Sequence, residues 1–118
     1  MNGCKILIIE DEGMIAMMVE DMVTGLGHQV AAVAGDLEKG LEAIEKETFD
    51  IALLDVNLNG RPSYPIAAAL FRRKVPFLLT TGYGVGIDEE WRKHPILQKP
   101  FTEQQLGRAL QGLAAPLG

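Results

Sequence analysis

The sequence lacks the features of a disulfide-stabilised, zinc-thiolate or membrane-spanning protein. Cys4 is the only cysteine among 118 residues, so the chain can form neither an internal disulfide nor a zinc site built from several thiolates. No apolar run approaches the roughly 20 residues of a membrane span, and the first residues lack the apolar stretch of a signal peptide. We therefore expect a cytoplasmic protein with no membrane association.

Basic residues are in the minority. The chain has 11 Lys and Arg against 16 Asp and Glu, which gives a net charge of −5. This balance disfavours the phosphate-binding surfaces of nucleic-acid-binding proteins, so the expected partner is a protein or a cation. The length favours one domain, residues 1–118, because domains usually contain roughly 100–200 residues.

Short apolar runs, typical of buried strands, alternate along the chain with segments of helical periodicity. We expect strands at residues 5–9, 30–34, 51–56, 77–80 and 96–98, and helices at 13–26, after the N-cap Asp36, at 65–73 and from a capping box at 102–105 onward. Residues 57–62 should form an irregular, turn-rich segment. Residues 82–94, with glycines at 82, 84 and 86, should be mobile apart from a short helix near 88–93.

Strands that alternate with helices through short loops predict a parallel sheet covered on both faces. The expected fold class is therefore α/β, a doubly wound five-stranded sheet of order 2-1-3-4-5 in a flavodoxin-like three-layer sandwich. In such folds the functional site lies at the carboxyl ends of the strands.

Polar residues follow those strand ends. The first predicted strand is followed by Glu10 and Asp11, the third ends near Asp55, the fourth precedes Thr81 and the fifth precedes Lys99. Neighbouring strands are about 4.8 Å apart, so the carboxylates should lie close together and repel one another unless a cation neutralises them. Oxygen-only ligands indicate Mg²⁺.

A phosphate at this position would find a metal ion, the Lys99 ammonium and the Thr81 hydroxyl around it. A carboxylate in such surroundings can attack a phosphoryl group and carry it as an aspartyl phosphate. Asp55 is the natural nucleophile, because it follows the buried run 51–54 and precedes a loop.

Four motifs together resemble the receiver domain of two-component response regulators: Ile8-Ile9-Glu10-Asp11-Glu12, Leu53-Leu54-Asp55-Val56-Asn57-Leu58-Asn59-Gly60, Thr81-Gly82 and Gln98-Lys99-Pro100-Phe101. Each motif alone is weak, whereas four in order at the ends of the right strands are specific. The resemblance spans residues 5 to about 114.

The resemblance implies a role for each matching residue. Asp55 would be the phosphoacceptor, with Mg²⁺ held by Glu10, Asp11 and Asp55 and by the backbone carbonyl of Asn57. Thr81 would be the switch hydroxyl and Lys99 the lysine that pairs with the phosphoryl group. Pro100 matches a proline that often follows a cis peptide bond.

The implied function is that of a stand-alone receiver. It would take a phosphoryl group from a sensor histidine kinase or a histidine phosphotransfer protein and bind a downstream protein target when phosphorylated. Such a receiver phosphorylates and dephosphorylates itself, and we expect no turnover of an external substrate.

Two departures concern the switch surface, which we assign to Thr81, Tyr83, Ile96 and Pro100. Many receivers have an aromatic residue three positions before the lysine, where this chain has Ile96. The run Leu79-Thr80-Thr81-Gly82-Tyr83 is similar to a subgroup of stand-alone receivers with a Phe-Ala-Thr-Gly-x-Tyr-like signature, although its first two residues differ. That similarity implies signalling by ordering of this loop.

Each of these residue groups also suits a purely structural role. The acidic residues 10–12 could cap a helix, Asp55 could belong to an ordinary Asx-rich turn, Thr81 could only close a strand and Lys99 could only be solvated. A phosphorylation-independent interaction module is one alternative function. A metal-dependent phosphatase is another, although Asn57 stands where such enzymes place a second acid, and a carboxylate-rich site does not suit an FMN carrier.

Three further features concern packing. Met18 and Met22 should lie on the core face of the first helix rather than in a metal-binding stripe. His28 and His94 should be surface residues. Trp91 suits either packing or partner contact.

Overall fold

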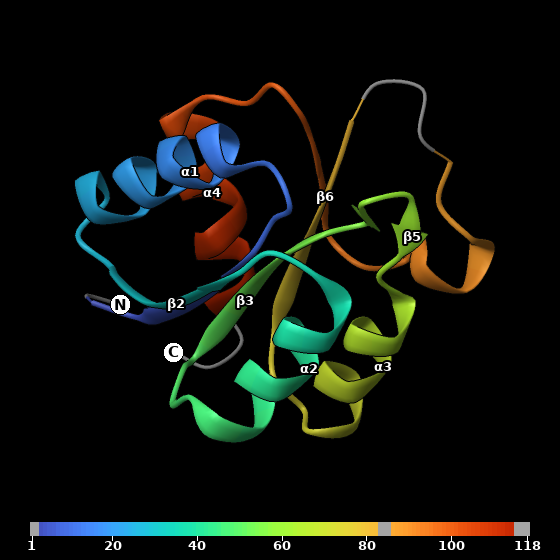
Figure 1. Ribbon diagram of the computed structural model, residues 1–118. Coiled ribbons are helices and arrows are strands. Elements are labelled where there is room, and N and C mark those ends of the chain that lie inside the picture. The colour runs from blue at the N-terminus through green and yellow to red at the C-terminus, as the bar shows by residue number, and fades with distance from the viewer. Residues whose placement is uncertain (1–2, 83–85, 115–118) are drawn as a thin grey trace.

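The sheet consists of five parallel strands in the order β2-β1-β3-β6-β7 (Figure 1). The computed structural model describes residues 3–82 and 86–114. The strands are β1 (Lys5–Ile9), β2 (Gln29–Ala34), β3 (Ile51–Asp55), β6 (Phe77–Thr81) and β7 (Ile96–Gln98). Because β6 and β7 are the fourth and fifth strands of this sheet along the chain, the predicted order 2-1-3-4-5 is confirmed.

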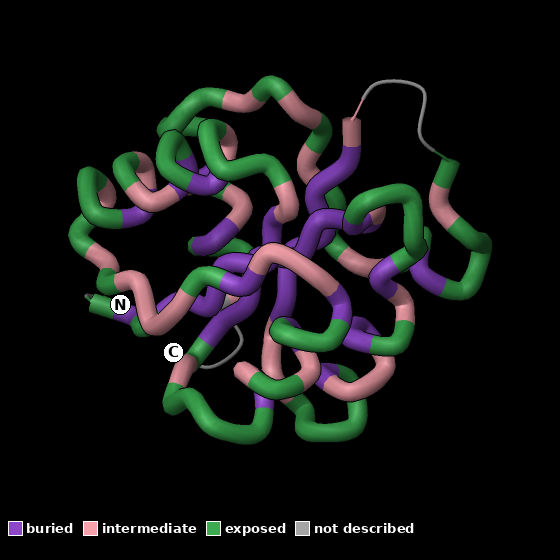
Figure 2. The backbone as a smooth tube through the Cα atoms, viewed as in Figure 1, coloured by how far each residue is buried: buried purple, intermediate pink, exposed green. Residues whose placement is uncertain are grey.

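Two helices cover each face of the sheet (Figure 1). Helices α1 (Gly13–Gly25) and α4 (Glu103–Ala114) pack on one face, and α2 (Leu37–Lys46) and α3 (Tyr64–Arg72) on the other. Alternate residues of β1 enter the two cores: Ile6 and Ile8 face α1 and α4, while Leu7 and Ile9 face α2 and α3. The interior of β1, residues 6–9, is therefore a continuous apolar run that is buried at every position. Buried backbone, purple in Figure 2, gathers at the centre of the molecule. Among the described residues, no helix combines the length and apolar character needed to cross a membrane.

Two of the predicted helix starts, at Asp36 and at Thr102, are confirmed by their capping bonds. Asp36 Oδ1 accepts a hydrogen bond from Lys39 N at 2.7 Å. At the start of α4, Thr102 N donates to Gln105 Oε1 at 2.8 Å and Gln105 N donates to Thr102 Oγ1 at 3.1 Å, which is the reciprocal pair of a capping box. Gly107 lets α4 approach α1 closely, because a Cβ there would lie 2.9 Å from Leu26 Cδ2.

The segment predicted as irregular at 57–62 is a short β-hairpin instead. Strands β4 (Asn57–Leu58) and β5 (Arg61–Pro62) pair antiparallel. Asn59 and Gly60 between them have φ values of 53° and 82°, which corresponds to the two positive φ angles of a type I′ turn. The Asn-Gly pair carried this signal, but two-residue strands are too short to show a period-2 pattern.

The prediction that Met18 lies on the core face was wrong. Its side chain is 56% exposed, and the buried face of α1 consists of Ala16, Val19 and Val23. The apolar surface of α1 is wider than its contact with the sheet. Met22, in contrast, packs against the core as predicted. It also lines, with Ile15 and Met18, a groove of about 310 Å³ that includes Pro100 and Phe101 of the loop after β7.

Trp91 is a packing residue. It ends a short 3₁₀ turn, η1 (Glu89–Trp91), within the predicted helix at 88–93, and its ring stacks on Tyr64 with centroids 6.0 Å apart. The ring of His94 lies 4.9 Å from that of Phe77 and 5.3 Å from that of Trp91. His94 is therefore half-buried, not a surface residue as predicted, and His28 is half-buried too. The expected mobility of 82–94 stays a prediction, and residues 83–85 lie outside the described part.

Candidate functional site

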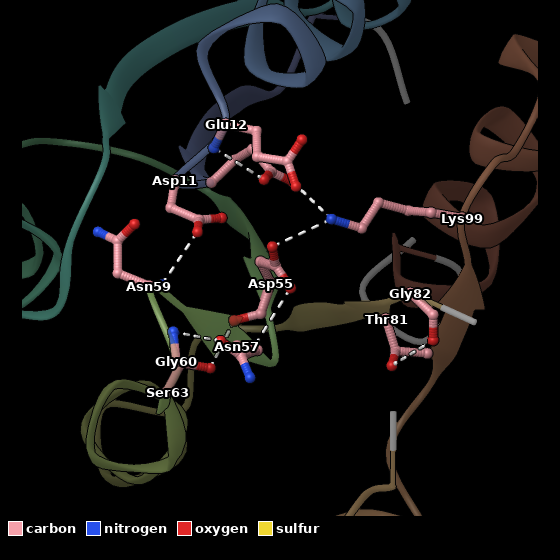
Figure 3. Close-up of polar contacts among 11 residues, drawn as sticks. Asp11, Glu12, Asp55, Asn57, Asn59, Gly60, Ser63, Thr81, Gly82 and Lys99 are labelled. Atoms are coloured by element: carbon pink, nitrogen blue, oxygen red, sulfur yellow. Dashed lines mark hydrogen bonds and ion pairs between the residues drawn. The ribbon is translucent and has the colours of Figure 1, made fainter. Parts of the chain in front are cut away.

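The carboxyl ends of β1, β3 and β7 bring the acidic residues and Lys99 together, as predicted (Figure 3). Glu10 follows β1, where its backbone N–H still bonds to Ala34 O at 3.0 Å. Asp55 is the last residue of β3, and Lys99 follows β7, with its backbone N–H bonded to Thr81 O at 2.7 Å. Since the backbone at each position is tied to a neighbouring strand, the side chains start from fixed points.

Lys99 Nζ lies between two buried carboxylates. It is 2.9 Å from Glu10 Oε1 and 3.0 Å from Asp55 Oδ2, and the three side chains are only 15%, 4% and 7% exposed. Both contacts are charge-assisted hydrogen bonds shielded from water, so they are stronger than the same pairs on the surface. The structural alternative of a solvated Lys99 is therefore wrong.

The ionisation of this group is strongly perturbed. Burial raises the pKa of Glu10 from 4.5 to about 7, opposed by the hydrogen bond from Lys99 and reinforced by the negative charge of Asp55. Burial would lower the pKa of Lys99, but its hydrogen bonds to Glu10 and Asp55 and their charges outweigh that effect and raise it. Lys99 therefore keeps its charge at neutral pH, while Glu10 is poised between its two forms.

Asp11 is the most exposed acid of the cluster and has a different partner. Its Oδ2 accepts a hydrogen bond from the backbone N–H of Asn59 at 2.9 Å. Burial would raise the pKa of Asp11, but the Asn59 bond and the hydrogen bonding with Glu10 and Asp55 bring it below the ordinary value. Asp11 is therefore ionised at neutral pH.

The three acids fit a hard divalent cation. Glu10, Asp11 and Asp55 each offer a carboxylate oxygen, and these oxygens lie within 4.8 Å of one another. The donor set is all oxygen, which suits Mg²⁺ rather than a thiolate- or imidazole-bound metal. The positively charged Lys99 ammonium lies beside two of these acids, Glu10 and Asp55. Asn57 N donates to Asp55 Oδ1 at 3.2 Å, whereas the ligand role of the Asn57 carbonyl stays a prediction.

The proposed switch residues are only partly gathered at the site. The Thr81 hydroxyl is turned toward the neighbouring Gly82 carbonyl at 3.3 Å rather than toward the acids (Figure 3). Ile96 begins β7 and is 38% exposed, and Pro100 lines the α1 groove after the expected cis peptide bond with Lys99. Tyr83 lies outside the described residues.

Sequence reasoning missed Ser63. This fully buried residue donates a hydrogen bond from Oγ to the backbone carbonyl of Asp55 at 2.6 Å. It stands at the N-cap of α3, before Tyr64 and Pro65, and makes no side-chain cap. A serine before a helix-starting proline indicates a cap, so the sequence carried no signal for this long-range bond.

Comparison with known proteins agrees with this geometry. The response regulator receiver domain family matches residues 6–111. The solution structure of SdrG from Sphingomonas melonis Fr1 is 40% identical, with a TM-score of 0.86 over 94% of this chain and 96% of that one. A second SdrG structure, in a BeF3-activated conformation, is 38% identical, with a TM-score of 0.80 over 96% of this chain and 98% of that one.

A curated relative is longer. The transcriptional regulatory protein TcrA of Mycobacterium tuberculosis is 30% identical over 119 aligned positions, which cover 96% of this chain and 47% of TcrA. The chain thus spans about half the length of this relative.

Proposed function

Since this chain belongs to the response regulator receiver domain family, we propose that it is the phosphoacceptor of a two-component phosphorelay and that Asp55 carries the phosphoryl group. The observation that supports this most is the placement of Lys99 Nζ 3.0 Å from Asp55 Oδ2, with Glu10 as the second partner of the ammonium. A buried aspartate with a lysine at this distance has a cation ready for the charge of a transferred phosphoryl group.

The chemistry follows from these residues. An oxygen of the Asp55 carboxylate attacks phosphorus, the bond from phosphorus to the donor's histidine nitrogen breaks, and the new bond is an acyl phosphate. Lys99 stays protonated and can pass from the Asp55 carboxylate to a phosphoryl oxygen. The Thr81 hydroxyl would exchange its weak bond to Gly82 O for the same phosphoryl group.

Magnesium would be held by Glu10, Asp11 and Asp55 with the Asn57 carbonyl, and when bound it neutralises negative charge on the carboxylates and the phosphoryl oxygens. The chain's own contribution is to hold the three carboxylates close together. Asp11 is held ionised by the Asn59 N–H. Glu10 must lose its proton to act as a ligand, because its pKa is near 7.

The donor would be a sensor histidine kinase or a histidine phosphotransfer protein in the cytoplasm, and the output would be phosphorylation-dependent binding of a protein target. A stand-alone role is part of this proposal. SdrG is described in a BeF3-activated conformation, and we expect the same treatment to activate this chain. Self-dephosphorylation, with no external substrate turned over, completes the cycle.

A direct experiment is incubation with Mg²⁺ and acetyl phosphate, followed by intact-mass measurement. One added phosphate is expected on the wild type and on Asp21→Asn, a control at an exposed aspartate of α1. Asp55→Asn should remain unmodified. Phosphate added to Asp55→Asn would contradict the assignment of Asp55 as the phosphoacceptor.

A phosphorylation-independent interaction module is the second candidate. It is favoured by Ile96 at the usual aromatic position and by the Thr81 hydroxyl, which is turned to Gly82. Binding to a copurified partner that is unaltered in both Asp55→Ala and Lys99→Ala would support it. Steady turnover of p-nitrophenyl phosphate would instead indicate the phosphatase alternative.

A further inference from the structure

We propose that the segment from Asn57 to Ser63 is a brace that sets the positions of Asp11 and Asp55 for the cation, and that Asn59 and Ser63 are positioning residues. This inference rests on the proposed magnesium-dependent function and adds residues to it. The brace, residues 57–63, is bonded to Asp11 through its turn and to Asp55 through Ser63.

The contact with Asp11 is made by the hairpin turn. The backbone N–H of Asn59 donates to Asp11 Oδ2 at 2.9 Å, and the dashed line in Figure 3 runs to the backbone of Asn59 and not to its side chain. The turn is closed by Gly60 N, which donates to Asn57 Oδ1 at 2.7 Å. Since Asn59 has a φ of 53°, a residue that tolerates the left-handed region is needed to aim this N–H at Asp11.

The contact with the Asp55 backbone carbonyl is made by Ser63. A serine at a helix N-cap ordinarily accepts a hydrogen bond from an N–H of the first helical turn. Ser63 makes no such bond, and its hydroxyl donates instead to Asp55 O at 2.6 Å, while its own N–H donates to Val56 O at 2.8 Å. Ser63 is fully buried and bonds to the backbone of Asp55 in place of capping its own helix. This exchange indicates that Ser63 positions Asp55.

Further contacts fix the brace in place. Asn57 N donates to Asp55 Oδ1 at 3.2 Å, so its main chain touches the nucleophile while its side chain closes the turn. On the outer side, Arg61 Nη1 lies 3.0 and 3.1 Å from the two carboxylate oxygens of Glu38 in α2. The brace is therefore attached to the sheet, to α2 and to both acids.

The brace matters because Asp11 and Asp55 come from different parts of the fold, one from a loop and one from a strand end. Asp11 lies between β1 and α1, and Asp55 ends β3. A Mg²⁺ ion demands near-ideal octahedral geometry, so free movement of one loop would weaken binding. Groups that orient metal ligands by hydrogen bonds typically change metal affinity 10- to 100-fold when removed.

The test compares Mg²⁺ dissociation constants, measured by calorimetry, of the wild type, Asn59→Val, Asn59→Gly and Ser63→Ala. Asn59→Val disfavours the positive φ and should bind Mg²⁺ about tenfold more weakly. Asn59→Gly keeps both the N–H and the positive φ and should bind within about twofold of the wild type. Ser63→Ala loses only a hydroxyl and should weaken binding about tenfold.

Two further readouts separate positioning from loss of structure. Without Mg²⁺, Asn59→Val should still unfold in one cooperative transition, although its thermal midpoint should lie below that of Asn59→Gly because a β-branched residue disfavours the positive φ at position 59. The phosphorylation rate of Asn59→Val should return toward that of the wild type as Mg²⁺ is raised to saturation. A rate that stays low at saturating Mg²⁺ would overturn the positioning role.

The outcomes distinguish the brace from the proposed function. If the wild type binds Mg²⁺ and both Asn59→Val and Ser63→Ala bind it equally well, the brace is wrong and the function stands. If Asn59→Gly is as weak as Asn59→Val, the side chain and not the backbone N–H is responsible, and the proposal fails. If the wild type binds no Mg²⁺, the metal site and the brace are both overturned.

Discussion

Lys99 Nζ lies 3.0 Å from Asp55 Oδ2, although 44 positions separate the two residues in the sequence. The parallel sheet creates this contact, because β3 and β7 both end at the same edge, on either side of β6. The pair links the fold to its proposed chemistry: a lysine already placed at the phosphoacceptor needs no large movement to reach a phosphoryl oxygen.

Replacing Lys99 should slow phosphorylation, whereas replacing an exposed lysine should not. Lys99→Ala removes the cation that faces the transferred phosphoryl group, so the rate of phosphorylation by acetyl phosphate should fall about 100-fold. Lys93→Ala, at an exposed lysine, should react like the wild type. The rate can be followed by intact mass over time, and an unchanged rate in Lys99→Ala would contradict the role of this ammonium.

The stability of the metal-free protein should depend on pH through Glu10. The pKa of Glu10 is raised to about 7 in the folded protein, mainly by burial, against 4.5 as its ordinary value. Between these values the folded protein holds a proton that the unfolded chain has released, so the free energy of unfolding should fall as pH rises from about 4.5 to 7. Urea unfolding at a series of pH values measures this slope.

Two comparisons isolate that contribution. In Glu10→Gln the slope between about pH 4.5 and 7 should be smaller than in the wild type, because no proton exchanges at this position. Mg²⁺ should stabilise the wild type more at pH 8 than at about pH 5, since the metal competes with the proton. Equal slopes in wild type and Glu10→Gln would show that Glu10 does not titrate in this range.

Trp91 should contribute through its ring surface and not through its N–H. The indole is buried, stacks on Tyr64, and its Nε1 has no hydrogen-bond partner among the described residues. Trp91→Ala should lower the free energy of unfolding by about 3–5 kcal/mol. Trp91→Phe should cost less than about 1.5 kcal/mol, because it also removes an unsatisfied buried donor. Chemical denaturation measures both, and equal losses would show that the ring surface is not what matters.

The two sides of α1 should respond differently to substitution. Val23 is fully buried, so Val23→Ala should cost about 2 kcal/mol of unfolding free energy. Met18 lies at the exposed groove, so Met18→Gln should change it by no more than about 0.5 kcal/mol. A large loss in Met18→Gln would mean that Met18 belongs to the core after all.

Much of the fold could be predicted because its signals are local. Strand interiors such as 5–9 and 51–54 are continuous apolar runs, and caps such as Asp36 follow from neighbouring residues. The acidic cluster and Lys99 were also predictable, because strand ends in a parallel sheet converge at one edge. That the side chains of Glu10, Asp55 and Lys99 lie close together therefore followed from the predicted strand order.

The remainder depends on contacts that no local pattern encodes. The bond from Ser63 to the Asp55 carbonyl joins positions eight residues apart, and the Asn59 backbone N–H that meets Asp11 is offered by every residue except proline. Met18 was misplaced because helical periodicity gives an apolar face without saying how much of it the sheet covers. Packing in three dimensions decides such features.

Formation of an acyl phosphate on Asp55 is the step on which the proposed function depends. It can be measured by treating the protein with Mg²⁺ and acetyl phosphate, reducing it with borohydride, which converts an aspartyl phosphate to homoserine, and mapping residue 55 by peptide mass spectrometry. We expect homoserine at position 55 in the wild type and none in Asp55→Asn. Homoserine at another carboxylate, or none in a wild type that has gained phosphate by intact mass, would contradict the assignment of Asp55.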